Sequence, residues 1–163
     1  MNQQQPIIEV KNLRKLFPVQ KTTLWDKEEK FVHAVDDVSF VLHHGEVLAL
    51  VGESGCGKST LALTLMNLET PTEGQIFFEG KDVTHLSGKA LQTMRRHIQM
   101  VFQDPYESLN PTMTIGDIVA EPLVVHRLAP NQQERDARVV QALEDAGLKP
   151  ASNFMHRYPH ELS

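Results

Sequence analysis

The sequence lacks the features that mark disulfide-rich, membrane-spanning and secreted proteins. Its 163 residues include one cysteine and one tryptophan. A single cysteine cannot form an internal disulfide, so we expect a reducing compartment rather than a disulfide-stapled scaffold. No apolar run approaches the roughly 20 residues that span a bilayer, and the N-terminus lacks the basic and apolar regions of a signal peptide. These absences predict a soluble protein, in which any membrane role comes through a partner.

Positive charge is also in short supply. The chain has 16 Lys and Arg against 21 Asp and Glu, a net charge of −5. The basic residues are scattered, apart from the pair at Arg95 and Arg96. Proteins that bind nucleic acid usually gather positive charge on one face. The charge pattern therefore argues against a nucleic-acid partner, and the length predicts one domain with a sizeable core.

What the sequence does contain is a glycine-rich phosphate-binding motif. Residues 47–60 read VLALVGESGCGKST, with the P-loop pattern Gly52-x-x-x-x-Gly57-Lys58-Ser59. Glycines let backbone N–H groups curve around phosphate oxygens, which side chains would obstruct. The helix expected from Lys58 directs its unpaired N–H groups and its positive dipole end at the anion. Lys58 would reach the β- and γ-phosphates, and the Ser59 hydroxyl would bind Mg²⁺.

The pattern of apolar residues places this motif between a strand and a helix, as a P-loop requires. Ser87 and Asn131 are expected as helix N-caps, and Gly147 as the residue after a helix. The polar stretch 20–30 is predicted to be an exposed hairpin or loop insertion. Strands are predicted at 7–11, 31–40, 46–51, 75–78 and 98–102, and helices at 58–68, 87–96, 115–126 and 132–146.

Three motifs in order resemble one family, the ATP-binding subunits of ABC transporters. GESGCGKST is similar to its Walker A motif, MVFQDP at 100–105 to its Q-loop, and YPHELS at 158–163 to the run-in to its LSGGQ signature. FQDPYESLNPTMTIGDIVAEPL and QKTTLWDKEEK most resemble oligopeptide and dipeptide importer subunits. The resemblance implies an α/β fold: a P-loop NTPase core of ABC ATPase type with an N-terminal antiparallel β portion, over 1–112. A helical subdomain would follow over 113–163, both parts incomplete and ending before the Walker B strand.

The resemblance also implies roles for single residues. Phe17 takes the place of the aromatic that stacks on adenine. Gln103 would approach Mg²⁺ or the attacking water, and Ser163 would touch the γ-phosphate held by the opposite subunit. Lys58 and Gln103 are the expected catalytic residues, and Ser59 and Gln103 the expected Mg²⁺ residues. The residues expected to bind ATP are Phe17, Gly52, Glu53, Ser54, Gly55, Cys56, Gly57, Lys58, Ser59, Thr60 and Ser163.

The partners implied by the resemblance are transmembrane permease subunits and a second ATP-binding subunit, identical or different. A peptide-binding protein would take part indirectly. The expected place is cytoplasmic, peripheral on the inner face of the cell membrane. The function expected is ATP binding and hydrolysis coupled to transport of oligopeptides or dipeptides.

Two other functions stay open. The 163 residues do not contain the rest of the signature, a Walker B motif, a D-loop or a switch histidine. We therefore expect the chain to bind ATP without hydrolysing it at a family-like rate. We also expect poor solubility or association with other chains. The first alternative function is a catalytically inactive nucleotide-binding fragment. A P-loop kinase is a further alternative, although no acceptor lid or acidic metal residue can be located. Neither a histidine metal site nor a catalytic role for Cys56 is expected.

Overall fold

The computed structural model describes residues 5–19, 30–104 and 108–162. The chain divides into two compact units, Met1–Gln99 and Met100–Ser163. Each unit has its own cluster of buried apolar side chains. Most of the predicted polar insertion, 20–29, lies outside the described residues.

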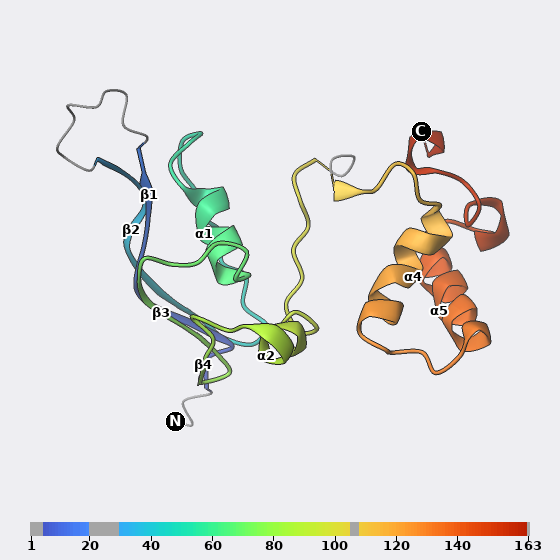
Figure 1. Ribbon diagram of the computed structural model, residues 1–163, viewed down its shortest axis with the longest axis horizontal. Coiled ribbons are helices and arrows are strands. Elements are labelled where there is room, and N and C mark those ends of the chain that lie inside the picture. The colour runs from blue at the N-terminus through green and yellow to red at the C-terminus, as the bar shows by residue number, and fades with distance from the viewer. Residues whose placement is uncertain (1–4, 20–29, 105–107, 163) are drawn as a thin grey trace. The chain divides into compact units, whose positions relative to one another are not determined.

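The first unit is built on an antiparallel sheet. Its strands are β1 (Ile8–Pro18), β2 (Phe31–Leu42), β3 (Glu73–Phe78) and β4 (Lys81–Asp82). Strand β1 lies inside the sheet and pairs with β2 on one side and β3 on the other, in the order β2-β1-β3-β4 (Figure 1). The predicted N-terminal antiparallel portion is therefore confirmed, with β1 longer than expected.

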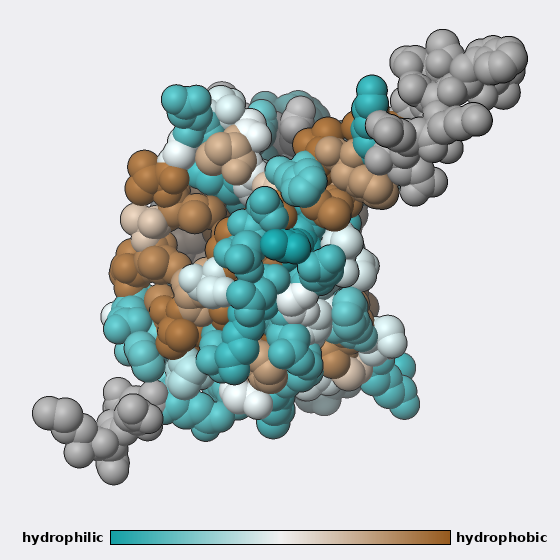
Figure 2. All heavy atoms as spheres, turned by 90° about the vertical axis from the view of Figure 1, so that its left-hand side faces the viewer, coloured by the Kyte–Doolittle hydropathy of each residue, from teal (hydrophilic) through white to brown (hydrophobic). Residues whose placement is uncertain are grey.

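Two helices cover one face of this sheet, α1 (Lys58–Leu65) and α2 (Gly88–Met94) (Figure 1). Alternate side chains of a strand point to opposite faces, so every second apolar residue can enter the core beneath the helices. On the side turned to the viewer in Figure 2, hydrophilic side chains run down the middle of the molecule. The buried core of the unit consists of Val10, Leu13, Val35, Leu61, Ile76, Val83 and Met94.

Two predicted strands are not formed. Neither 46–51 nor 98–102 has strand structure, and the apolar run before the glycine loop is exposed. Val47 is 96% exposed, Val51 88% and Val101 93%. A strand is held by hydrogen bonds to a neighbouring strand, and neither segment pairs with another among the described residues. Apolar sequence alone therefore did not suffice to make a strand here.

The second unit is helical. Helices α4 (Ile115–Val125) and α5 (Gln132–Asp145) pack together, followed by the single turns η1 (Ala151–Asn153) and η2 (Pro159–Glu161). The Asn131 side chain accepts from the Glu134 N–H at 2.9 Å, which confirms the predicted N-cap. Gly147 has φ +88° just past α5, as predicted. None of the described helices is both long and apolar enough to cross a membrane.

Candidate functional site

The glycine loop of residues 52–57 is shaped by two glycines in the left-handed region. Gly55 has φ +82° and Gly57 has φ +95°, values that residues with a side chain rarely adopt. The Cys56 N–H donates to the Glu53 carbonyl at 3.3 Å and closes the turn. A Cβ on Gly52 would lie 2.6 Å from the Cys56 sulfur. The loop is therefore tightly curved, as a backbone that wraps an anion must be.

The Lys58 ammonium lies within this loop. Its Nζ donates to the Gly52 carbonyl at 2.8 Å and to the Glu53 carbonyl at 2.6 Å. The Cys56 sulfur lies 3.5 Å from the same nitrogen. Bonds to neutral carbonyls can be exchanged for bonds to an anion, which binds an ammonium more strongly. The lysine thus places a positive charge where the loop curves.

Helix α1 begins directly after the loop. Its N-cap is Gly57, and no side chain caps it. The first-turn N–H groups of such a helix have no intrahelical partner and favour an anion. Ser59 lies exposed in that first turn, and its hydroxyl is the kind of oxygen ligand that Mg²⁺ accepts. These residues fit a phosphate and its Mg²⁺.

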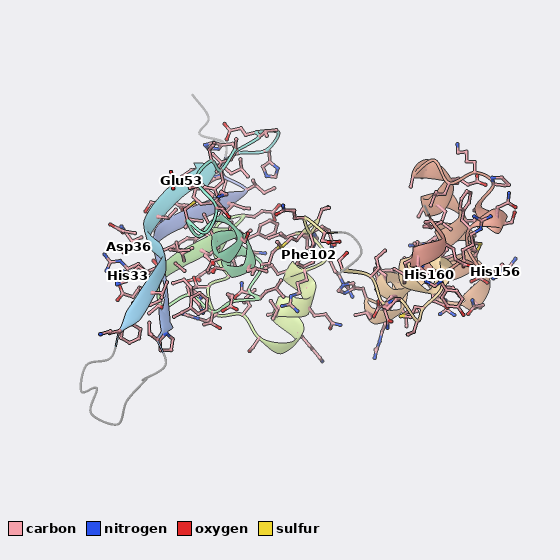
Figure 3. The ribbon with its side chains drawn as sticks, turned by 90° about the horizontal axis from the view of Figure 1, so that it is seen from above. His33, Asp36, Glu53, Phe102, His156 and His160 are labelled. Atoms are coloured by element: carbon pink, nitrogen blue, oxygen red, sulfur yellow. The ribbon has the colours of Figure 1, made fainter. Side chains whose placement is uncertain are left out.

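The loop is pressed against strand β2. A Cβ on Gly57 would lie 1.8 Å from the Ala34 carbonyl oxygen, so only glycine fits there. Beside this contact is a cavity of about 300 Å³, lined by β2, the end of the segment 46–51, the loop and the start of α1. His33 and Asp36 of β2 border it, with His33 Nδ1 3.7 Å from Asp36 Oδ2 (Figure 3).

Phe17 lies close to this contact along the sheet. It is half-buried near the end of β1 and pairs with Val32 of β2. Ala34, which contacts the loop, is two residues further along β2, a distance of about 7 Å. Phe17 and the glycine loop thus flank one short stretch of strand. A ligand with an aromatic ring and a phosphate tail could reach both.

The structure does not place two of the predicted site residues relative to this loop. Gln103 belongs to the second unit and lies in a segment without helix or strand. Its approach to Mg²⁺ stays a prediction. Ser163 lies outside the described residues, and so does its predicted role.

Within 5–19, 30–104 and 108–162, no group of three or more His, Cys, Asp or Glu side chains could hold a metal ion. His156 and His160 both lie in the last segment of the second unit (Figure 3). The ring of His160 stacks on Tyr158, with centroids 5.8 Å apart.

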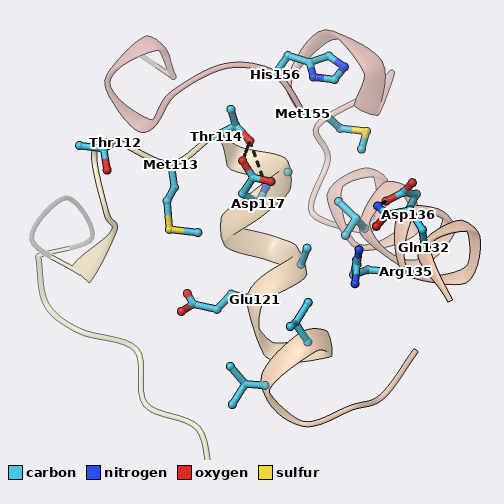
Figure 4. A pocket seen from close by; sticks show the side chains of 15 residues that line it. Thr112, Met113, Thr114, Asp117, Glu121, Gln132, Arg135, Asp136, Met155 and His156 are labelled. Atoms are coloured by element: carbon cyan, nitrogen blue, oxygen red, sulfur yellow. Dashed lines mark hydrogen bonds between the residues drawn. The ribbon is translucent and has the colours of Figure 1, made fainter. Parts of the chain in front are cut away.

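The second unit has a cavity of its own, of about 880 Å³. It lies between α4, α5 and the segment around Met155 (Figure 4). On one side Thr114 and Asp117 are hydrogen-bonded, with 2.6 Å between the hydroxyl and the carboxylate. Arg135 projects from the α5 side. No motif in the sequence predicts this cavity.

Sequence reasoning missed one residue beside the expected site. The Lys15 ammonium lies 4.7 Å from the centroid of the Phe17 ring. The two residues are separated by one position on a strand, so their side chains share a face. The spacing Lys-x-Phe at a strand end was the available signal.

Two relatives are similar in sequence to this chain over almost its whole length. The chain is 46% identical over 161 residues to the oligopeptide transport ATP-binding protein AppF of Bacillus subtilis, covering 98% of this chain and 48% of AppF. It is 47% identical over 159 residues to the glutathione import ATP-binding protein GsiA of Escherichia coli K12, covering 98% of this chain and 25% of GsiA. The chain therefore spans about half of the first relative and a quarter of the second.

The fold also has solved counterparts. A dimeric ATP-binding cassette in a post-hydrolysis state with ADP and Pi matches with a TM-score of 0.74 at 27% identity, over 96% of this chain and 63% of that one. The sequence profile described as ABC transporter matches residues 35–163, which include the glycine loop. This chain, with its α/β P-loop fold and helical second unit, belongs to the ABC transporter family.

Proposed function

We propose that this chain is the nucleotide-binding part of an ABC-type importer subunit and takes ATP with Mg²⁺. The observation that carries the proposal is the Lys58 ammonium held inside a loop of left-handed glycines. An uncapped helix N-terminus follows the same loop. A curved backbone, a fixed positive charge and free N–H donors together suit a polyphosphate.

We propose a separate role for each group of the loop in binding ATP and Mg²⁺. The backbone N–H groups from Gly52 to Thr60, with Glu53, Ser54, Gly55, Cys56 and Gly57 between them, would donate to phosphate oxygens. Lys58 would exchange the two loop carbonyls for the β- and γ-phosphates. Ser59 would hold Mg²⁺, which neutralises charge on the phosphates when it is bound.

Three further roles rest on the resemblance and on position. Phe17 would stack on adenine, because it is half-buried and lies beside the stretch of β2 that contacts the loop. Gln103 would sense Mg²⁺ or the attacking water, and Ser163 would complete the site of a second subunit. The division into a core over 1–112 and a helical subdomain over 113–163 belongs to the same proposal.

The transported solute and the partners are proposed from the relatives. AppF is described by its name as an oligopeptide transport protein and GsiA as a glutathione import protein. We propose oligopeptides or dipeptides as the solute class here. Permease subunits at the inner face of the membrane, a second ATP-binding subunit and, indirectly, a peptide-binding protein would be the partners. ATP binding and hydrolysis would then drive import.

A calorimetric titration with Mg-ATP tests the proposal. Lys58→Ala removes the ammonium from the loop, and we expect it to weaken binding by about tenfold to a hundredfold, as for a lost charge-assisted hydrogen bond. Lys89→Ala is the control, because Lys89 is an exposed lysine of α2. Equal affinity of the wild type and Lys58→Ala would refute a phosphate site in this loop.

A further inference from the structure

One lysine next to the proposed base-stacking aromatic has three partners. Lys15 Nζ lies 4.7 Å from the Phe17 ring centroid, 2.8 Å from Glu69 Oε2 and 2.8 Å from the Thr70 carbonyl, to which it donates. Its side chain is only 12% exposed. An ammonium with a carboxylate, a carbonyl and a ring face around it is held in one place, because each partner restricts a different direction.

The segment that holds Lys15 is itself fastened to β1. The Thr72 N–H donates to the Arg14 carbonyl at 2.8 Å, and the Leu16 N–H donates to the Thr72 hydroxyl at 2.9 Å. This segment, 69–72, follows α1, the helix that starts in the glycine loop. Lys15 therefore joins the end of β1 to the segment that follows α1.

The position of Lys15 constrains what the Phe17 ring can bind. A ring has two faces, and the ammonium occupies one of them. A planar base can then stack only on the other face. The cation also draws π-electron density toward itself, which makes the opposite face less negative and better suited to an electron-rich ring system.

We propose that Lys15 is a positioning residue for the nucleotide base: it fixes the Phe17 ring and favours stacking of an electron-rich purine on the face that it leaves open. The inference rests on the proposed nucleotide function of the glycine loop. It adds a residue that positions the proposed base-stacking ring, whereas the groups of the loop would bind phosphates.

The test compares two ligands that differ in the base. Mg-ATP carries a purine, whereas inorganic triphosphate with Mg²⁺ carries only the phosphates. Lys15→Met removes the charge and keeps the length of the side chain. We expect it to weaken ATP binding about fivefold to tenfold, within the range of a desolvated cation–π contact, and to leave triphosphate binding within about twofold. Lys15→Arg keeps the charge and should restore most of the ATP affinity.

The chain provides a matched control on the same strand. Lys11 Nζ also lies 4.7 Å from an aromatic centroid, that of Phe77, and it pairs with Glu9 at 3.1 Å. Phe77 has no proposed contact with nucleotide. Lys11→Met therefore removes a contact of the same kind, and ATP and triphosphate affinities should both stay at their wild-type values.

A double-mutant cycle separates positioning from general stabilisation. In a Phe17→Leu background, Lys15→Met should no longer change ATP affinity, because the ring on which it acts is gone. Equal weakening of ATP and triphosphate by Lys15→Met, or an unchanged loss in the Phe17→Leu background, would overturn the inference. If the wild type binds triphosphate but gains nothing from the base, base positioning fails while the phosphate site stands. If the wild type binds neither ligand, the proposed function fails and the inference fails with it.

Discussion

At the scale of single residues, the glycine loop depends on a contact between Gly57 and the Ala34 carbonyl of β2. A Cβ at Gly57 would lie 1.8 Å from that oxygen, so the backbones of the loop and the strand approach closely. The contact joins parts of the chain that are distant in sequence. The motif therefore predicts the curved loop and the helix after it, but not the strand that supports the loop.

Gly57→Ala tests that support. The substitution combines a left-handed φ of +95° with a Cβ 1.8 Å from a backbone oxygen, so the loop or β2 must move. We expect a loss of more than about 2 kcal/mol in the free energy of unfolding, together with loss of ATP binding. Urea denaturation and titration measure both. Gly45→Ala is the control: Gly45 has φ +78° and no neighbour within 4 Å, so only the conformational cost of about 1 kcal/mol applies.

Cys56 gives a second test at this scale, because it is the one cysteine in the chain and is exposed in the loop. A maleimide therefore labels a single site. Phosphates bound in the loop would cover the thiol, and we expect saturating Mg-ATP to slow labelling several-fold, as measured by intact mass. Labelling at the same rate with and without Mg-ATP, or equal protection in Lys58→Ala, would contradict phosphate binding at this place.

At the scale of elements, capping residues and apolar patterns predicted the helices and the antiparallel strands well. They did not predict which apolar segments find a partner strand. Helix α5 begins and ends near its predicted positions because Asn131 and Gly147 act locally. Helix α1 ends earlier than predicted, at Leu65, and Asn67 with φ +51° follows in the turn. The segments 46–51 and 98–102 failed as strands, since a strand depends on a partner that its own residues do not specify.

A carboxyl group in the hairpin of β3 and β4 should make the stability of the protein depend on pH. Hydrogen bonds from the Thr84 hydroxyl, at 2.6 Å, and the Thr84 N–H, at 2.9 Å, lower the pKa of Asp82 from its ordinary value of 3.8. A carboxyl with a lowered pKa binds fewer protons when folded than when unfolded. Its contribution to stability is therefore present above the unfolded pKa and is lost as pH falls through the folded one. We expect urea unfolding to show this loss below about pH 4.

Thr84→Val should reduce that acid-dependent loss. The buried hydroxyl also accepts from the Ile76 N–H at 2.9 Å, so the variant leaves a buried donor without its acceptor. We expect it to lower the free energy of unfolding at pH 7 by about 1–3 kcal/mol. Thr93→Val serves as control, since Thr93 is exposed and its hydroxyl donates to the Lys89 carbonyl of the same helix. An unchanged slope below pH 4 in Thr84→Val would show that Asp82 is not the group responsible.

At the scale of the whole molecule, the exposed apolar segments predict association. Val47 is 96% exposed in a segment without paired strand structure, which can pair with another chain. We expect the chain to self-associate, and Val47→Lys to raise the monomer fraction in light scattering after size exclusion. Val124→Lys is the control, because Val124 is 53% exposed but lies on a helix with its backbone bonded. A wild type that is entirely monomeric would contradict the prediction.

On the proposed function, the glycine loop binds the phosphates of ATP through its backbone N–H groups. Amide chemical shifts of the ¹⁵N-labelled chain, followed through a Mg-ATP titration, test this binding residue by residue. We predict that the largest shifts fall on residues 52–60 and that Lys58→Ala needs at least about tenfold more Mg-ATP to reach them. Shifts confined to the cavity around Asp117 and Arg135, or no saturable shifts at all, would contradict it.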